Sequence, residues 1–351
     1  ACNVNTSHAI FGSSAESGKQ AEVFLPVKEG DLIFMLYDDE QIYHRYDPAD
    51  GKSIAVTFDT LDVFRAYLNG RLSYMELIHP SCVEAFNKLT EVEMEQLSFL
   101  YLEDDIVEDL LPVLQEHESS LQGIGLMLES SKGSGKLMDL ISIARPRVLV
   151  IDDSWTLPEP EEQVSLSSLE LLWIDGDLNA LEKLARCCSN LESLIIANWE
   201  PGSGELLPLS SLKNLKSLTI AESSLTSLST LEFPQSLHHL YVLACDTLAD
   251  IQDLLKLTSL KSLSLTQCMR ITNPGILKEI QGLHYLSPPP GISQQEFLEL
   301  LDRQPQLEVL ELIDCAKIQN ISHLQTAQDL RVLLLQLEYE QLQGLDLLDQ
   351  L

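Results

Sequence analysis

Two stretches near the middle of the chain, LHHLYV at residues 237–242 and LKSLSL at residues 260–265, share one spacing of leucines. The shared pattern is L-x-x-L-x-L with aliphatic substitutions, and it returns every 22–26 residues from about residue 97 to residue 337. The second and third leucines are two residues apart, so both point to the same side of a β-strand. One such strand cannot bury its apolar side alone, so the pattern predicts copies stacked side by side around a shared core.

The second leucine of the pattern, called the middle leucine below, marks the register of each copy. Most intervals between middle leucines are 22–24 residues, and the first is 26. For the second copy, Leu121, Ile124 and Leu126 form a competing frame. The copy at Leu286 runs into Pro288–Pro290, and because proline cannot donate to a sheet ladder, we expect a short or broken strand there. The middle leucines are Leu100, Leu126, Leu149, Leu172, Leu194, Leu218, Leu240, Leu263, Leu286, Leu310 and Leu333.

Residues 263–273, LSLTQCMRITN, resemble the cysteine-containing subclass of the leucine-rich-repeat superfamily, and the wider resemblance covers about residues 94–340. It implies an α/β solenoid with a curved parallel sheet, and with helices and irregular segments on its convex side. Members of that subclass are often substrate-recognition parts of ubiquitin ligases, and the superfamily also includes bacterial effectors and immune sensors. No F-box-like helix bundle is evident before the repeats of this chain.

The sequence predicts three regions. Residues 1–20 form a flexible polar arm, residues 21–92 a small α/β or α+β module with short strands, and residues 93–351 a solenoid of about 11 repeats with a carboxyl-terminal cap. Strands of the module are expected at residues 22–25, 31–37, 41–46 and 53–58. Convex-side helices are expected at residues 105–117, 179–188, 249–255, 273–280 and 294–304, whereas residues 201–211 and 222–234 look irregular.

The chain is strongly acidic, with 54 Asp and Glu against 22 Lys and Arg and a net charge of −32. This charge opposes binding to nucleic acid or to anionic membrane surfaces, and it favours a partner with a basic segment. No run of 18 apolar residues suggests membrane insertion. The first 20 residues lack the apolar segment of a signal peptide, although the chain does not begin with Met. We expect a cytoplasmic protein, or one secreted into a host cytoplasm if it is an effector.

The seven cysteines include no C-x-x-C motif and no disulfide framework spacing. Cys245, Cys268 and Cys315 each lie three residues after the third leucine of a repeat. The sequence therefore predicts buried structural thiols at this position, typical of a reducing compartment.

No stretch of the sequence convincingly predicts catalysis, a cofactor or a metal site. Residues 12–19 have one residue too many between their glycines for a phosphate-binding loop, and residues 131–136 lack the leading glycine. Neither clearly follows a strand and precedes a helix. His238 and His239 are neighbours on one predicted strand and so face opposite sides, which does not suit converging metal ligands.

The register also predicts which side chains point away from the core, onto the concave face. The column one residue after the middle leucine includes Tyr101, Trp173, Ile195 and Tyr241. The column two residues further places carboxylates in four consecutive repeats, at Glu103, Glu129, Asp152 and Asp175. Like charges on neighbouring strands are destabilising unless a partner offsets them, and aromatic residues are common in binding hot spots.

We therefore predict a non-catalytic protein-recognition module that uses these eight residues to bind a basic, partly apolar segment of a partner. The alternative is that the carboxylates of this acidic protein are distributed over exposed strands and have no role in binding. Two further alternatives are a substrate-recognition subunit of a ubiquitin-ligase-type complex or secreted effector, and an enzyme whose active site lies in the amino-terminal module.

Overall fold

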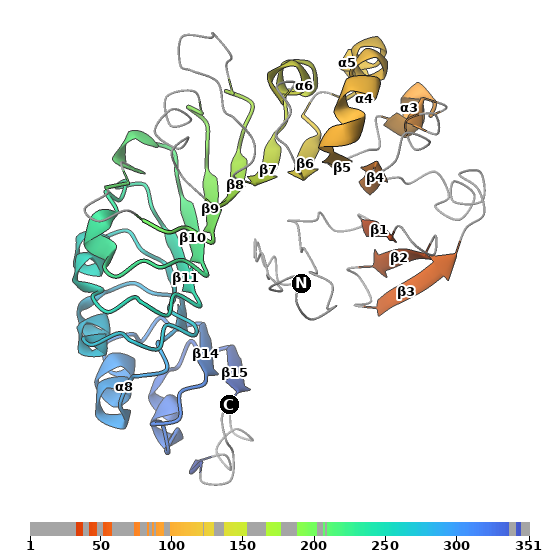
Figure 1. Ribbon diagram of the computed structural model, residues 1–351. Coiled ribbons are helices and arrows are strands. Elements are labelled where there is room, and N and C mark those ends of the chain that lie inside the picture. The colour runs from red at the N-terminus through yellow and green to blue at the C-terminus, as the bar shows by residue number, and fades with distance from the viewer. Residues whose placement is uncertain are drawn as a thin grey trace. The chain divides into compact units, whose positions relative to one another are not determined.

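The computed structural model describes residues 33–37, 42–47, 52–57, 74–77, 83, 86–87, 89–94, 99–121, 123–129, 137–152, 166–176, 188–201, 206–207, 209–336 and 342–344. The chain divides into two compact units, Ala1–Ile124 and Gly125–Leu351, which are described separately below. Figure 1 shows the helices and strands of both units. The boundary expected at residues 92–93 stays a prediction.

The first unit contains an antiparallel sheet and a parallel strand pair. Strands β1 (Ile33–Tyr37), β2 (Ile42–Asp47) and β3 (Lys52–Thr57) pair in the order β1-β2-β3 and coincide with the strands expected there. Strand β4 (Tyr74–Leu77) runs parallel to β5 (Phe99–Glu103), with Met75 opposite Leu100. Parallel pairing therefore begins one strand before the first predicted repeat.

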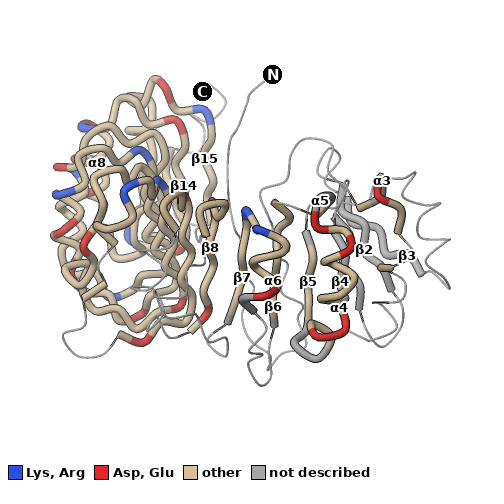
Figure 2. Tube along the Cα trace, turned by 90° about the horizontal axis from the view of Figure 1, so that it is seen from above, with Lys and Arg blue, Asp and Glu red and all other residues tan. Residues whose placement is uncertain are grey.

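Three helices complete the described part of the first unit: α3 (Glu91–Met94), α4 (Asp104–Glu116) and α5 (Glu118–Leu121). Helix α4 confirms the helix expected at residues 105–117. It carries acidic residues but no Lys or Arg (Figure 2).

In the second unit, ten described strands form a parallel sheet in which each strand pairs with the next one along the chain (Figure 1). The middle leucines lie directly opposite one another in every pair, from Leu126 to Leu333, so the predicted register is confirmed. The competing frame around Ile124 is wrong, because Leu126 pairs with Leu149. The strands are β6 (Gly125–Glu129), β7 (Val148–Asp152), β8 (Leu171–Asp175), β9 (Ser193–Ala197), β10 (Ser217–Ala221), β11 (His239–Leu243), β12 (Ser262–Ser264), β13 (Tyr285–Ser287), β14 (Val309–Ile313) and β15 (Val332–Gln336).

The leucines of successive repeats form one continuous core. Each middle leucine from Leu126 to Leu310 is at most 1% exposed, and burying a leucine contributes about 1.5–3 kcal/mol. Leu333 is only half-buried because its strand, β15, is the last of the described sheet. Strand β13 has three residues and stops before Pro288, as the proline run predicted.

Among the described connections of the second unit that were expected to be α-helical, one is an α-helix and two are the more tightly wound 3-10 helices. Helix α8 (Gln294–Leu301) confirms a predicted α-helix and begins with a capping box between Ser293 and Glu296. Residues expected to form α-helices at 249–255 and 273–280 instead form 3-10 helices, η3 (Gln252–Lys256) and η4 (Pro274–Glu279). These connections are short, and a 3-10 turn advances about 2.0 Å per residue where an α-helix advances 1.5 Å, so it covers the distance with fewer residues.

The other described connections contain one unpredicted α-helix and short 3-10 turns. In the described residues of the segments expected to be irregular, 201–211 and 222–234, only single 3-10 turns are found, and the helix expected at 179–188 lies largely outside the described residues. These elements are α6 (Leu137–Ala144), η1 (Leu209–Ser211), η2 (Leu228–Thr230) and η5 (Ser322–Thr326).

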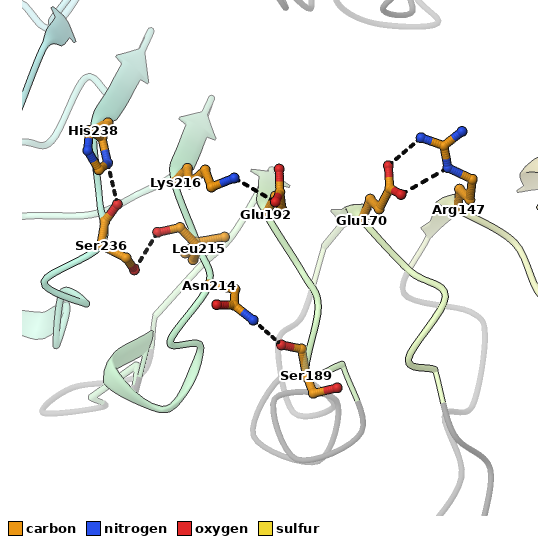
Figure 3. A network of polar contacts seen from close by, with 9 residues as sticks. All are labelled: Arg147, Glu170, Ser189, Glu192, Asn214, Leu215, Lys216, Ser236 and His238. Atoms are coloured by element: carbon orange, nitrogen blue, oxygen red, sulfur yellow. Dashed lines mark hydrogen bonds and ion pairs between the residues drawn. The ribbon is translucent and has the colours of Figure 1, made fainter.

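A row of charged side chains joins neighbouring repeats where the chain enters each strand, two residues before the middle leucine (Figure 3). Arg147 forms a two-pronged hydrogen bond with Glu170, at 3.0 and 2.6 Å, and the Lys216 Nζ lies 2.6 Å from the Glu192 Oε1. The Arg147 backbone carbonyl also accepts from two amides of the next repeat, those of Glu170 and Leu171. The ion pairs are about half exposed and contribute at most about 1 kcal/mol each, so they supplement the backbone bonds rather than hold the repeats together.

A second set of polar contacts lies two residues earlier in each repeat. The amide side chains of Asn190 and Asn214 each donate 2.7 Å hydrogen bonds to backbone carbonyls of the preceding repeat, and the Ser236 hydroxyl does the same. Figure 3 shows the contacts of Asn214 and Ser236. These contacts satisfy carbonyls that no helix or strand uses.

At the other end of the strands, the chain turns through a left-handed backbone conformation four residues after the middle leucine. Ala244 has φ 51°, and its amide donates to the Thr266 carbonyl of the next repeat at 2.9 Å. Only glycine adopts this conformation without strain, and other residues lose roughly 1 kcal/mol. The equivalent residues with positive φ are Gly176, Asn198, Glu222, Gln267 and Asp314.

The predicted burial of the repeat-position cysteines is confirmed. Cys245, Cys268 and Cys315 are free thiols that are fully buried. The Cys268 Sγ donates to the Val242 carbonyl at 3.4 Å, and in another repeat the Ser223 hydroxyl donates to the Ala221 carbonyl at 2.9 Å. A small hydrogen-bond donor at this position therefore satisfies a carbonyl at the turn that follows the strand.

The leucine core predicts a sharp contrast between two leucines of the sheet. Leu263→Ala should lower the free energy of unfolding by about 2–5 kcal/mol, because it leaves a cavity between packed strands. Leu334→Ala, at a half-exposed position of β15, should change it by less than about 0.5 kcal/mol. Urea unfolding followed by circular dichroism checks both, and equal losses would contradict the assignment of the core.

The left-handed turn predicts opposite effects of glycine at two alanines. Ala244→Gly should raise the free energy of unfolding by up to about 1 kcal/mol, whereas Ala244→Val should lower it by more than about 1 kcal/mol. Ala316→Gly, at an exposed alanine without positive φ, should be destabilising by about 0.4–1 kcal/mol. Thermal unfolding of the three variants measures the sign of each change.

The buried Cys315 thiol should be unreactive in the folded protein. Burial raises the pKa of the Cys315 thiol to about 12, so its thiolate fraction at pH 8 is roughly 1,000-fold below that of an ordinary cysteine. Peptide-resolved alkylation with iodoacetamide should label Cys315 only after unfolding in urea. Labelling of Cys315 at the same rate before and after unfolding would show that the site is open.

Candidate functional site

The face of the sheet opposite the leucine core carries outward columns of side chains, and two of these columns contain the predicted site residues. In the second unit the strands lie on the inner side of the curve and α8 lies outside it (Figure 1). One column follows the middle leucine, with Val150 opposite Trp173 and Trp173 opposite Ile195. In the other column Asp152 lies opposite Asp175, and Asp175 lies opposite Ala197.

Four of the predicted site residues can be placed only by their backbone. Tyr101 and Glu103 lie on β5 of the first unit, and Glu129 and Asp152 lie on β6 and β7 of the second. Their side chains lie outside the described residues. Whether these four take part in binding therefore stays a prediction.

Trp173 and Ile195 occupy outward positions, yet their side chains are only 8% and 7% exposed. They lie side by side on neighbouring strands, next to the buried Val150 and Thr219. Together they form a buried apolar patch within this face, here called the apolar floor, and they do not protrude from it as contact residues.

The carboxylate column ends where small residues begin. Asp175 is half-buried, and its Oδ1 accepts a 2.6 Å hydrogen bond from the Asn198 Nδ2. The next two positions are Ala197 and Ala221, both buried. One carboxylate of the predicted site is therefore held by a neutral amide from the neighbouring repeat.

A second group on the same face, here called the tyrosine cluster, consists of Tyr241, Ser262, Ser264, Tyr285 and Glu311 on β11–β14. The rings of Tyr241 and Tyr285 meet edge to face, with their centroids 5.9 Å apart. The Tyr285 hydroxyl donates a 2.7 Å hydrogen bond to the Glu311 Oε2. The serines belong to β12, the strand between the two tyrosines, and both are buried. Because serines are small, the rings can lean over β12 from both sides.

The environment keeps both tyrosines protonated. Burial raises the pKa of Tyr241, and a hydrogen bond with Ser262 partly opposes this rise. Burial and the hydrogen bond to the carboxylate of Glu311 raise the pKa of Tyr285 further. Both hydroxyls therefore remain donors throughout the physiological range.

Sequence reasoning found Tyr241 but missed Tyr285 and Glu311. Tyr285 lies one residue before its middle leucine, in a third outward column that the sequence prediction did not follow. Glu311 lies in the same column as Tyr241, three strands further on. Following this third column, and extending the column of Tyr241 to the last repeat, would have found the pair.

Several kinds of chemistry have no support among the described residues. No group of three or more His, Cys, Asp and Glu in that part of the chain could hold a metal ion. None of the helices found there combines the length and apolar character needed to cross a membrane.

The second phosphate-loop candidate lies in a context that the sequence did not predict. Strand β6 precedes residues 130–136, and helix α6 follows them, as a phosphate-binding loop requires. Ser130 nevertheless stands where the motif needs glycine, and Leu137 where it needs Ser or Thr. The loop itself and the first candidate, residues 12–19, lie outside the described residues.

Comparison with known proteins found no matching family model and no matching curated protein. Among solved structures, the chain is similar to an internalin from Listeria monocytogenes, at 18% identity and a TM-score of 0.42, over 73% of this chain and 74% of that one. It is also similar to a chain of the Drosophila Toll–Spatzle complex, at 12% identity and a TM-score of 0.39, over 87% of this chain and 38% of that one. A third is the leucine-rich-repeat domain of APL1B, at 14% identity and a TM-score of 0.33, over 81% of this chain and 74% of that one.

These likenesses are too distant to carry an argument, and the fold assignment rests on the chain itself. Each repeat of the second unit adds one parallel strand, the middle leucines stay in register, and the leucines of all repeats share one core. The chain is a leucine-rich-repeat solenoid protein.

Proposed function

We propose that this protein is a non-catalytic recognition module that binds a protein partner on the concave face of its repeats. The observation that carries the proposal is the continuous parallel sheet of the second unit, which presents its outward columns on one side. Stacked repeats of this kind create extended surfaces suited to other chains.

The partner is proposed to carry a basic, partly apolar segment. Asp152 and Asp175 occupy directly paired positions of neighbouring strands, which are about 4.8 Å apart, and like charges at such positions destabilise a sheet. The Asn198 amide relieves Asp175 only in part, because it carries no charge. A basic side chain from a partner would remove the repulsion, and the apolar floor of Trp173 and Ile195 lies beside it.

The net charge of −32 supports the same choice of partner. It raises the local concentration of cationic chains and accelerates their encounter with the protein. The buried thiols of Cys245, Cys268 and Cys315, in the described repeats, are consistent with a reducing compartment such as the cytoplasm. An adaptor of a larger assembly and an effector acting in a host cytoplasm both fit this proposal.

The proposal predicts that neutralising the carboxylate column weakens partner capture. A variant with Glu103→Gln, Glu129→Gln, Asp152→Asn and Asp175→Asn should lose at least about 10-fold in affinity and most of its salt dependence. The matched control removes four exposed carboxylates elsewhere, by Glu116→Gln, Glu232→Gln, Glu279→Gln and Asp329→Asn.

The measurement is capture of the partner from native lysate by the intact chain, followed by titration of the purified partner at 50 and 200 mM salt. The control variant should retain the affinity of the unmodified protein within about twofold. Equal affinities and equal salt dependence for both variants would refute a role for the column.

A further inference from the structure

The tyrosine cluster combines two aromatic rings with a carboxylate on one patch of the concave face. Tyr241 and Tyr285 are half-buried, so part of each ring remains accessible. Their edge-to-face contact and the Tyr285 hydrogen bond to Glu311 hold the three side chains in a defined arrangement. This preorganisation lowers the entropy lost when a ligand binds.

Among the described residues, no Lys, Arg or His forms an ion pair with the Glu311 carboxylate. The adjacent bases point elsewhere: Glu308 holds both His284, at 2.9 Å, and Arg331, at 3.6 Å. The Lys261 ammonium lies beside Gly282, on the connection before β13.

The serine and threonine hydroxyl groups around the cluster already form hydrogen bonds within the protein. Ser264 and Ser287 are buried, and Thr266 bridges them with hydrogen bonds of 2.7 and 2.9 Å. The Ser262 hydroxyl lies 2.9 Å from the His239 Nδ1. A ligand that relies on hydroxyl contacts, such as a sugar, would have to break this network, whereas a cation needs only the carboxylate and the ring faces.

We propose that Tyr241, Tyr285 and Glu311 form a receptor for one cationic side chain, the ammonium of lysine or the guanidinium of arginine, on a protein partner. The positive group contacts the faces of the two rings and donates to the free lone pairs of the Glu311 carboxylate. This inference rests on the proposed function in taking the concave face as the binding surface, and it adds a site that begins on β11, five strands beyond the start of the carboxylate column in the second unit.

The test uses the full chain and three fluorescein-labelled peptides of one Gly-Ser sequence, carrying three lysines, three arginines or three acetyl-lysines. Fluorescence anisotropy at 50 mM salt should show binding of a charged peptide and none of the acetyl-lysine peptide. The lysine and arginine peptides separate the two possible cations, since arginine can also form a bidentate bond to Glu311.

The variants separate this site from general acidity. Glu311→Gln should weaken binding at least about 10-fold, because it removes a charge-assisted hydrogen bond. Tyr241→Leu should weaken it about 2–5-fold through loss of one ring face. The matched control is Glu308→Gln, which removes the same charge three residues away and should leave affinity within about twofold. Thermal unfolding verifies that each variant is folded.

The outcomes distinguish this inference from the proposed function. Equal weakening by Glu311→Gln and Glu308→Gln would show that only overall charge attracts the peptide, and would overturn the receptor. Loss of binding in the carboxylate-column variant alone would overturn the receptor while supporting the proposed function. Absence of charged-peptide binding would equally overturn the receptor, and the lysate capture would still decide the proposed function.

Discussion

Burial of leucine between neighbouring strands is the interaction on which the rest of this protein depends. No repeat has enough apolar surface to fold alone, so each leucine of a strand packs against the leucines of the strands before and after it. The register of the whole described sheet follows, because a slip of one residue would turn every leucine to the outside. Leu333 lies on β15, the last strand of the described sheet, and it is less buried than the middle leucines that have a strand on both sides.

The polar groups of the repeats serve this stacking. Where the chain enters a strand, each backbone carbonyl of the charged row accepts amides from the next repeat, and the side-chain ion pairs add little. Where it leaves, a left-handed residue and a small donor such as Cys268 or Ser223 satisfy the turn. The left-handed residue and the small donor recur because the chain must turn away from the sheet at the same position of each repeat.

Much of the fold could be predicted because its signals are local. The leucine spacing predicted all nine strand pairings of the second unit, the short strand before Pro288 and the burial of Cys245, Cys268 and Cys315. The connections were harder to predict: residues 249–255 and 273–280 have helical composition, but the length of the gap selects a 3-10 turn. Helix α6 was not predicted, because its eight residues span little more than two turns and so carry little helical periodicity.

The sequence by itself determined the strands, their register and which side chains face away from the core, because all three follow from a period of two within a strand and of 22–24 residues between strands. Only the tertiary structure decided which outward residues are accessible and which meet. Trp173 faces outward yet is buried by its neighbours, whereas Tyr241 and Tyr285 reach each other across the serines of β12. The exposure of a side chain and its contacts depend on side chains from several repeats at once, so the sequence of a single repeat does not determine them.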